Sequence, residues 1–271
     1  MCRNLCVSRS GYYNWRNRGV SDRERANHAL RLHVNAIFKQ YKQRYGSPRI
    51  YRELRSLGID CSLNRVARIM RSEALRALKK RRFRPTTDSK HNLPVAPNLV
   101  KQEFEADKPN QLWTSDITFI WTKEGWLYLV VILDVFSRQI VGWALRKRMP
   151  KELVLDALKQ AVEIRRPQAG LIFHSDRGSQ YASKKVQKYL IANHMKQSMS
   201  RKGDCYDNAI TESFFKTLKT ELVYNRAVFQ TRREAQREIF NYIEGFYNRI
   251  RRHSSIGYLA PVDFEKLHHA A

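Results

Sequence analysis

Three acidic residues occupy positions where a carboxylate is either costly or well placed to do chemistry. Asp116 lies inside an apolar stretch, Asp176 directly follows the apolar run Leu171–Ser175, and Glu212 belongs to a stretch with helical periodicity. A charge inside an apolar strand is destabilising unless it is compensated, and a divalent cation that takes oxygen ligands would compensate it. For any one of these residues taken alone, a hydrogen-bonded structural role is an equally good explanation.

Together the three carboxylates could hold two Mg²⁺ ions about 3.5–4 Å apart, with Mn²⁺ as a possible substitute. One ion would activate the attacking oxygen and the other would stabilise the leaving 3′ oxygen of a phosphodiester. Lys219 follows Glu212 by seven residues, which places it on the same helical face but about 10 Å further along the axis. We therefore expect Lys219 to contact a phosphate or base beside the site rather than the same metal. The alternative is a solvated lysine, paired with Glu221 or with nothing.

The elements that must position these acids alternate between strand and helix patterns. Short connections between the first three strands favour an antiparallel meander. The order βββαβα predicts an α/β fold with a ribonuclease-H-like core, which is a mixed five-stranded sheet with flanking helices. The predicted strands are Trp113–Trp121, Trp126–Leu133, Ile140–Leu145 and Leu171–Ser175, and the predicted helices run through Leu153–Val162 and from about Ile210 to Leu222.

The N-terminal third reads as helices. Ser21 and Glu24 form a capping box before a long first helix, Ser47 and Pro48 begin a second that stops at Gly58, and Ser62 begins a third. This pattern predicts a small all-α helix-turn-helix domain whose last helix meets DNA. Three packed helices with a solvated basic face are the alternative. The third helix turns Val66, Ile69 and Met70 inward and Arg65, Arg68 and Arg71 outward.

A basic segment separates the two patterns. It begins with Lys79, Lys80, Arg81 and Arg82 and contains Pro85, Pro94, Pro97 and Pro109. Little periodicity and several prolines are typical of a linker, here one that crosses a phosphate backbone. The predicted domains are a helix-turn-helix region at 1–78, a linker at 79–110 and a catalytic core with C-terminal helices at 111–271.

The charge composition of the chain indicates which class of molecule it binds. The chain has 51 Lys and Arg against 25 Asp and Glu, a formal charge of +26, and such an excess favours a nucleic acid over a membrane surface. The longest apolar run, Trp126–Leu133, is too short to span a bilayer, and the start lacks an apolar leader. We therefore expect a cytoplasmic protein, nucleoid-associated when bound to DNA. The four cysteines show no C-x-x-C pair, which favours free thiols over disulfides or zinc.

The chain resembles the integrase-like transposases encoded by the downstream frame of two-frame bacterial insertion sequences, whose catalytic core is of the retroviral-integrase type. Thirty-five residues lie between Asp176 and Glu212, as in those enzymes, and Lys219 follows. A zinc module of the retroviral kind is missing, because His28 and His33 have no paired cysteines downstream. The matching segments are Arg9–Tyr13, Arg44–Ile50, Trp113–Thr118, His174–Gly178, Lys202–Phe215 and Tyr247–Pro261.

The resemblance implies a DDE-type enzyme that cleaves 3′ ends of an element and transfers them to target DNA. It makes Asp116, Asp176 and Glu212 the metal ligands and places Asp134 at a structural turn. Lys219 then contacts DNA, while Asn208 and Arg252–His253 border the site or are structural. DNA contacts are expected from Lys219, Arg65, Arg68, Arg71, Lys79, Lys80, Arg81, Arg82, Asn208, Lys202 and Arg252.

The same resemblance leaves a binding-module reading open. Downstream-frame products can lack a helix-turn-helix and oligomerisation segment that the fused protein carries, and no heptad run precedes Arg23 here. The chain would then be an accessory or inhibitory protein that needs an upstream-frame partner or fusion. Otherwise we expect a homo-oligomer assembled on the element ends and target DNA.

Overall fold

The computed structural model describes residues 2, 4–78, 95–201, 209–224 and 227–269. The chain divides into two compact units, residues 1–78 and 79–271. In the described part, no helix has both the length and the apolar character needed to cross a membrane.

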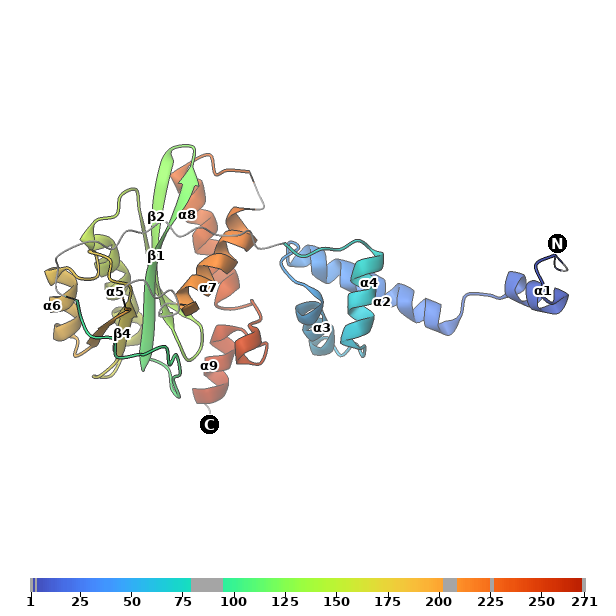
Figure 1. Cartoon of the computed structure of the whole chain (residues 1–271), viewed down its shortest axis with the longest axis horizontal. Coiled ribbons are helices and arrows are strands. Elements are labelled where there is room, and N and C mark those ends of the chain that lie inside the picture. Colours follow the sequence, from blue (N-terminus) through green and yellow to red (C-terminus); the bar gives the residue numbers. More distant parts are fainter. Residues whose placement is uncertain (1, 3, 79–94, 202–208, 225–226, 270–271) are drawn as a thin grey trace. The chain divides into compact units, whose positions relative to one another are not determined.

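Unit 1 is helical (Figure 1). Ser21 caps α2 by accepting a hydrogen bond from the amide of Glu24, and Ser62 caps α4 through the amide of Arg65, as predicted. Ser47 is not a cap: it is the first residue of α3, whose cap is Gly46, because Pro48 takes the second helical position. The helices are α1 Arg9–Asn17, α2 Asp22–Gln40, α3 Ser47–Ser56 and α4 Leu63–Ser72.

A small apolar core holds three of these helices together. α2, α3 and α4 contact one another pairwise, whereas α1 has no buried residue. Their amphipathic spacing supplies the core side chains, which confirms the inward set predicted for α4. The buried apolar residues are Leu30, Val34, Ile37, Phe38, Tyr45, Ile50, Leu54, Val66, Ile69 and Met70.

Unit 2 is built on a five-stranded mixed sheet of order β3-β2-β1-β4-β5. The first three strands are antiparallel, and β4 and β5 continue the sheet in parallel with β1. This arrangement confirms the predicted meander and the ribonuclease-H-like order. The strands are β1 Leu112–Thr122, β2 Gly125–Asp134, β3 Ile140–Arg146, β4 Ile172–Ser175 and β5 Lys196–Met199.

Helices cover both faces of the sheet (Figure 1). β2 shows why: Val130 and Ile132 pack into the cluster with α5 and α6, while Val131 and Leu133 pack with α7, α8 and η3. A strand buried on both faces is a continuous apolar run. The remaining helices are α5 Lys151–Arg165, α6 Lys184–Ala192, α7 Ala209–Leu218, α8 Arg232–Phe240, η4 Ser254–Ile256 and α9 Pro261–His269, with π-helical segments η2 Lys219–Val223 and η3 Asn241–Tyr247.

Part of the expected linker is built into unit 2. Residues 79–94 lie outside the described residues, but 95–110 pack against the sheet. Val100 is buried with Leu112 and Val135, and the amide of Leu99 donates to the Ser198 hydroxyl at 2.9 Å. Apolar side chains between the prolines can bury surface against the core, so low periodicity did not mean a free linker.

Candidate active site

The register between two parallel strands brings the first two acids together. Ser115 of β1 pairs with Ser175 of β4, and each is followed by an aspartate, Asp116 and Asp176. Neighbouring strands lie about 4.8 Å apart, so these residues stand side by side at the carboxyl end of β4. Such ends are common ligand sites in α/β folds.

The third acid comes from the first turn of α7. Thr211 donates a hydrogen bond from its hydroxyl to that of Thr114 at 2.8 Å, and both residues are buried. This bond joins α7 to β1 one residue before Glu212 and two residues before Asp116. The helix therefore presents Glu212 toward the two aspartates.

The charges of Asp176 and Glu212 both act on Asp116. Burial, followed by the charge of Asp176, raises the pKa of Asp116 well above its usual range, and Glu212 raises it further. The amide of Ile117 and the ammonium of Lys219 lower the pKa of Asp116, but by less. Three mutually repelling carboxylates without full compensation have the charge that a divalent cation would balance.

Each carboxylate also keeps a local partner. Asp116 accepts from the Ile117 amide at 2.7 Å and Asp176 from the Gly178 amide at 2.9 Å, while Glu212 lies 3.5 Å from the Lys216 ammonium. Accordingly, no group of three His, Cys, Asp or Glu side chains in the described part of the chain has metal-holding geometry. The oxygen donor set fits a hard cation, and the side chains must rotate from these partners to share one.

Gly178 closes the turn that carries Asp176. A Cβ atom there would lie 2.9 Å from the Asp176 carboxylate oxygen, so a larger residue would push the acid out of place. Tyr181 joins this turn to β1. It is buried, its amide donates to the Gly178 carbonyl at 2.9 Å, and its hydroxyl lies 2.9 Å from that of Ser115. Burial, then the charges of Asp116 and Asp176, raise the pKa of Tyr181 well above its usual range. Sequence reasoning missed Tyr181, which lies just beyond the Asp-Arg-Gly turn.

Lys219 is buried beside the acids. Only 6% of it is exposed, and its ammonium lies 5.1 Å from the ring centre of Phe119. Burial lowers the pKa of Lys219, and the charge of Asp116 opposes that shift. The solvated-lysine alternative is therefore wrong, and Lys219 lies buried near Asp116. The predicted helix to Leu222 changes to the π-helical η2 at this residue.

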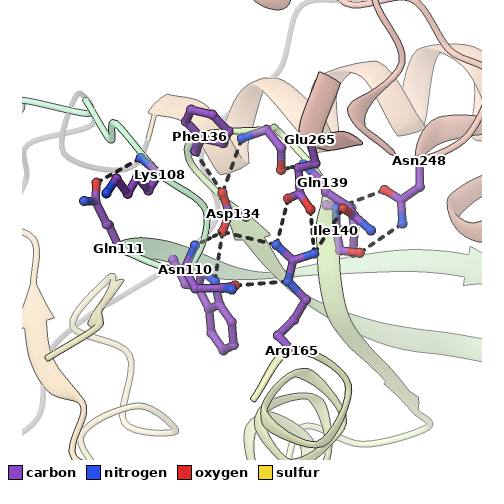
Figure 2. Close-up of polar contacts among 12 residues, drawn as sticks. Lys108, Asn110, Gln111, Asp134, Phe136, Gln139, Ile140, Arg165, Asn248 and Glu265 are labelled. Atoms are coloured by element: carbon purple, nitrogen blue, oxygen red, sulfur yellow. Dashed lines mark hydrogen bonds and ion pairs between the residues drawn. The ribbon is translucent and has the colours of Figure 1, made fainter. Parts of the chain in front are cut away.

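Asp134, the fourth acid, is structural (Figure 2). Its buried carboxylate accepts hydrogen bonds from the Asn110 amide at 2.7 Å and from the Trp113 indole at 3.1 Å. Arg165 approaches it to 4.0 Å and pairs with Glu265 of α9 at 2.7 Å. Burial raises the pKa of Asp134, with hydrogen bonds and Arg165 opposing. These contacts join the strand ends to α5 and α9.

The predicted DNA contacts lie in several places. Arg68 and Arg71 are exposed on α4, and Arg65 donates to the Asn27 side chain at 2.9 Å. Arg252 donates to the Tyr258 carbonyl at 3.2 Å in unit 2. Lys79, Lys80, Arg81, Arg82, Lys202 and Asn208 lie outside the described residues. A pocket of about 480 Å³ in unit 1 is lined by Asp22, Arg23, Ala26, Asn27, Ser62, Arg65 and Arg68.

Comparison with known proteins assigns the units to domain families. Residues 106–205 and 212–268 match two families that are both described as Integrase core domain. Residues 24–83 match a family described as HTH-like domain. A chain of the simian T-cell lymphotropic virus intasome, solved in complex with PP2A regulatory subunit B56 gamma, aligns with a TM-score of 0.50 at 14% identity and covers 86% of this chain and 74% of that one. That likeness concerns the fold alone.

Full-length relatives are much closer in sequence. The chain is 47% identical over 269 residues to the 31 kDa protein of insertion element IS600 from Shigella sonnei, covering 99% of this chain and 98% of that protein. It is 45% identical over 267 residues to the transposase InsF of insertion sequence IS3A from Escherichia coli strain K12, covering 98% of this chain and 92% of that protein. The chain therefore belongs to the IS3-type insertion-sequence transposases, with an HTH-like domain before an integrase core domain.

Proposed function

We propose that this transposase binds the DNA ends of its element, cleaves a strand to release a 3′ hydroxyl, and joins that hydroxyl to target DNA. Asp116, Asp176 and Glu212 are the residues that carry the chemistry. The register of β1 and β4 is the main support, because it sets two aspartates side by side in front of Glu212. Both steps are phosphoryl transfers and can use one site.

The three carboxylates would hold Mg²⁺, in two ions by analogy with other phosphoryl-transfer sites, with Mn²⁺ as a substitute. Bound there, the cations supply Lewis acidity to the attacking and leaving oxygens of the phosphodiester. The chain's own residues orient the site: Thr211 ties α7 to β1, and the Gly178 turn aims Asp176. Lys219 contributes a buried positive charge next to Asp116 and within reach of a phosphate beside the scissile one.

DNA recognition is assigned to basic residues of both units. Arg65, Arg68 and Arg71 on α4 would meet the element end as the last helix of the helix-turn-helix. The basic run at 79–82, with Lys202, Asn208 and Arg252, would hold phosphates along the DNA. The excess of positive charge in the chain supports this assignment.

Partners and location follow from the same reading. We expect a homo-oligomer on DNA, because two element ends must be joined in one event, and an upstream-frame protein or fusion remains a partner to test. We place the protein in the bacterial cytoplasm, on the nucleoid when bound. The accessory or inhibitory role is disfavoured, because a relative named as a transposase matches over 98% of this chain and 92% of its own length.

Neutral replacement of the acids tests the proposed chemistry. Asp116→Asn, Asp176→Asn and Glu212→Gln should each lower cleavage of labelled element ends by at least about 100-fold, since each removes charge that organises the transition state. DNA binding in a gel-shift assay should stay within about twofold. Asp156→Asn on α5, whose partner is Arg146, is the matched control. Normal turnover by any one of the three variants would disprove the triad.

A further inference from the structure

The hairpin of β1 and β2 carries an exposed group of aromatic rings beyond the acid site. Trp126 packs edge-on against Phe119, with ring centres 5.1 Å apart, and against Trp121 at 4.8 Å. Trp121 is 48% exposed and Trp126 43%. We call Phe119, Trp121 and Trp126 the aromatic hairpin surface. Aromatic side chains of this size each normally bury 150–250 Å², so two half-exposed tryptophans in contact are a costly surface for a monomer to keep.

Several contacts anchor the hairpin that carries this surface. Gly125 turns the hairpin with φ +104°, and a Cβ atom there would lie 2.8 Å from the Arg232 guanidinium. Arg232 donates to the Trp126 carbonyl at 3.2 Å, and its amide donates to the Glu124 carboxylate at 2.8 Å. The Lys123 amide donates to Phe229 at 2.9 Å. These contacts fasten the hairpin tip to the start of α8.

Within the described part of the chain, a stretch of β1 without a strand partner on one edge connects the rings to the acids. Alternation along β1 puts Asp116 and Phe119 on opposite faces. Among the described residues, however, β4 pairs with β1 only as far as Ser115, and the next backbone bridge on that edge is at Thr122. Lys219 reaches across this edge, since it lies over the Phe119 ring and interacts with the charge of Asp116. A DNA strand that crosses this edge of β1 would contact both the face that carries Asp116 and the face that carries Phe119.

The spacing of the rings from Asp116 and the basic groups near them favour a nucleic-acid strand as the ligand. At about 3.4 Å per residue, Phe119 lies about 10 Å and Trp121 about 17 Å along the strand from Asp116. Because one nucleotide of a DNA strand advances by at least the 3.4 Å of the duplex, these distances correspond to only a few nucleotides. The Lys219 ammonium lies over the Phe119 ring, and the Arg232 guanidinium binds the backbone carbonyl of Trp126. Aromatic rings beside basic groups are the usual means of holding single-stranded nucleic acid.

We propose that the aromatic hairpin surface stacks on unpaired bases of the DNA strand whose phosphate lies at the acid site, a few nucleotides away. This inference rests on the proposed function and names a subsite for it. Stacking tolerates any base sequence because every base has a π-face. The surface would hold a melted DNA end without reading its sequence.

Binding of two synthetic strands tests the proposal. The probes are a fluorescein-labelled 20-nucleotide oligothymidine and the same strand with its central five nucleotides made abasic, and fluorescence anisotropy is measured with the full chain without metal. Trp121→Ala and Trp126→Ala should each weaken binding of oligothymidine at least about fivefold and binding of the abasic strand less than twofold. Trp121→Phe should bind like wild type. Ile191→Ala, exposed on α6, is the control.

Three results would overturn the subsite. They are unchanged oligothymidine binding by both alanine variants, equal losses on the two strands, or a loss of self-association in light scattering without a loss of base-dependent binding. The last outcome would assign the surface to a second copy of the chain. Trp126→Leu, which keeps apolar bulk without a flat ring, separates stacking from loss of folding. Because no metal is present, the result is independent of cleavage, whose failure in the wild type would instead count against the proposed function.

Discussion

At the scale of single residues, Lys219 and Asp116 form the most informative pair. Spacing alone placed Lys219 beside Glu212 as a DNA contact, whereas its burial also makes it a charge partner of Asp116. The two roles are compatible, since one ammonium can balance the charge of a neighbouring carboxylate and also attract a phosphate that binds beside it. They differ in how activity depends on pH.

Replacing Lys219 by Ala should move the acidic limb of the pH–cleavage profile to higher pH. Lys219 lowers the pKa of Asp116, so its removal raises that pKa, and Asp116 must be ionised to bind a cation. The loss of activity should therefore be largest at low pH and smaller as pH rises. Lys219→Arg should keep the acidic limb of the profile at its wild-type pH. Lys188→Ala, at an exposed lysine of α6, is the control. If Lys219→Ala weakens DNA binding but does not move the acidic limb of the pH–cleavage profile, Lys219 acts only as a DNA contact and not as a charge partner of Asp116.

At the scale of elements, the contact between β3 and α5 has no spare room. A Cβ atom at Gly142 would overlap the Ala157 carbonyl and lie 2.8 Å from the Ala161 Cβ atom. Backbone on one side and a short side chain on the other cannot move aside cheaply. Small residues at this crossing let α5 sit close enough to bury Leu153 and Leu158.

Gly142→Ala should lower the free energy of unfolding by about 1–3 kcal/mol, because the added methyl group forces α5 away from β3. Urea denaturation followed by circular dichroism measures it. Gly245→Ala is the matched control, since a Cβ atom there meets nothing within 4 Å and the change should be neutral or stabilising. A Gly142→Ala variant as stable as wild type would contradict this prediction, because it would show that α5 can move away from β3 at little cost.

The end of α7 shows what packing adds to a helix. Glu221 of η2 pairs with Arg251 at 2.8 Å and accepts from the Tyr242 hydroxyl at 2.8 Å, all buried. Burial alone would lower the pKa of Arg251, but Glu221, Tyr242 and Tyr247 together more than offset it, so the pKa is raised. A buried ion pair of this kind holds the π-helical segments together, and losing one partner is strongly destabilising.

At the scale of the whole molecule, a formal charge of +26 makes DNA binding electrostatic and distributed. The logarithm of nonspecific duplex affinity should fall with the logarithm of salt concentration by about 0.9 for each phosphate neutralised. Converting Lys79, Lys80, Arg81 and Arg82 together to Ala should weaken binding and reduce that slope.

The same titration needs a charge-matched control. Four exposed lysines of unit 2, Lys184, Lys185, Lys188 and Lys196, can be replaced by Ala together. If the basic run at 79–82 tracks the phosphate backbone, this control should change the slope far less. A salt-independent affinity, or equal changes in the two quadruple variants, would contradict the assignment.

Local patterns in the sequence determined much of this protein. The caps Ser21 and Ser62, the apolar run of β2 and the strand before Asp176 were predictable, because caps and periodicity depend on residues within a few positions. The motifs around Asp116, Asp176 and Glu212 identified the family. β5, with the short polar sequence Lys196–Met199, was not predicted as a strand because its pairing with β4 makes it one.

Only the tertiary structure decided how these parts meet. The pairing of Ser115 with Ser175 sets Asp116 beside Asp176, and nothing in either segment alone specifies that register. Burial of Lys219, the change to π-helix after α7 and the docking of residues 95–110 likewise depend on contacts between distant segments. Local propensity chooses an element, whereas its neighbours, its depth and the charge around its acids come from long-range packing, which the pattern of one segment does not contain.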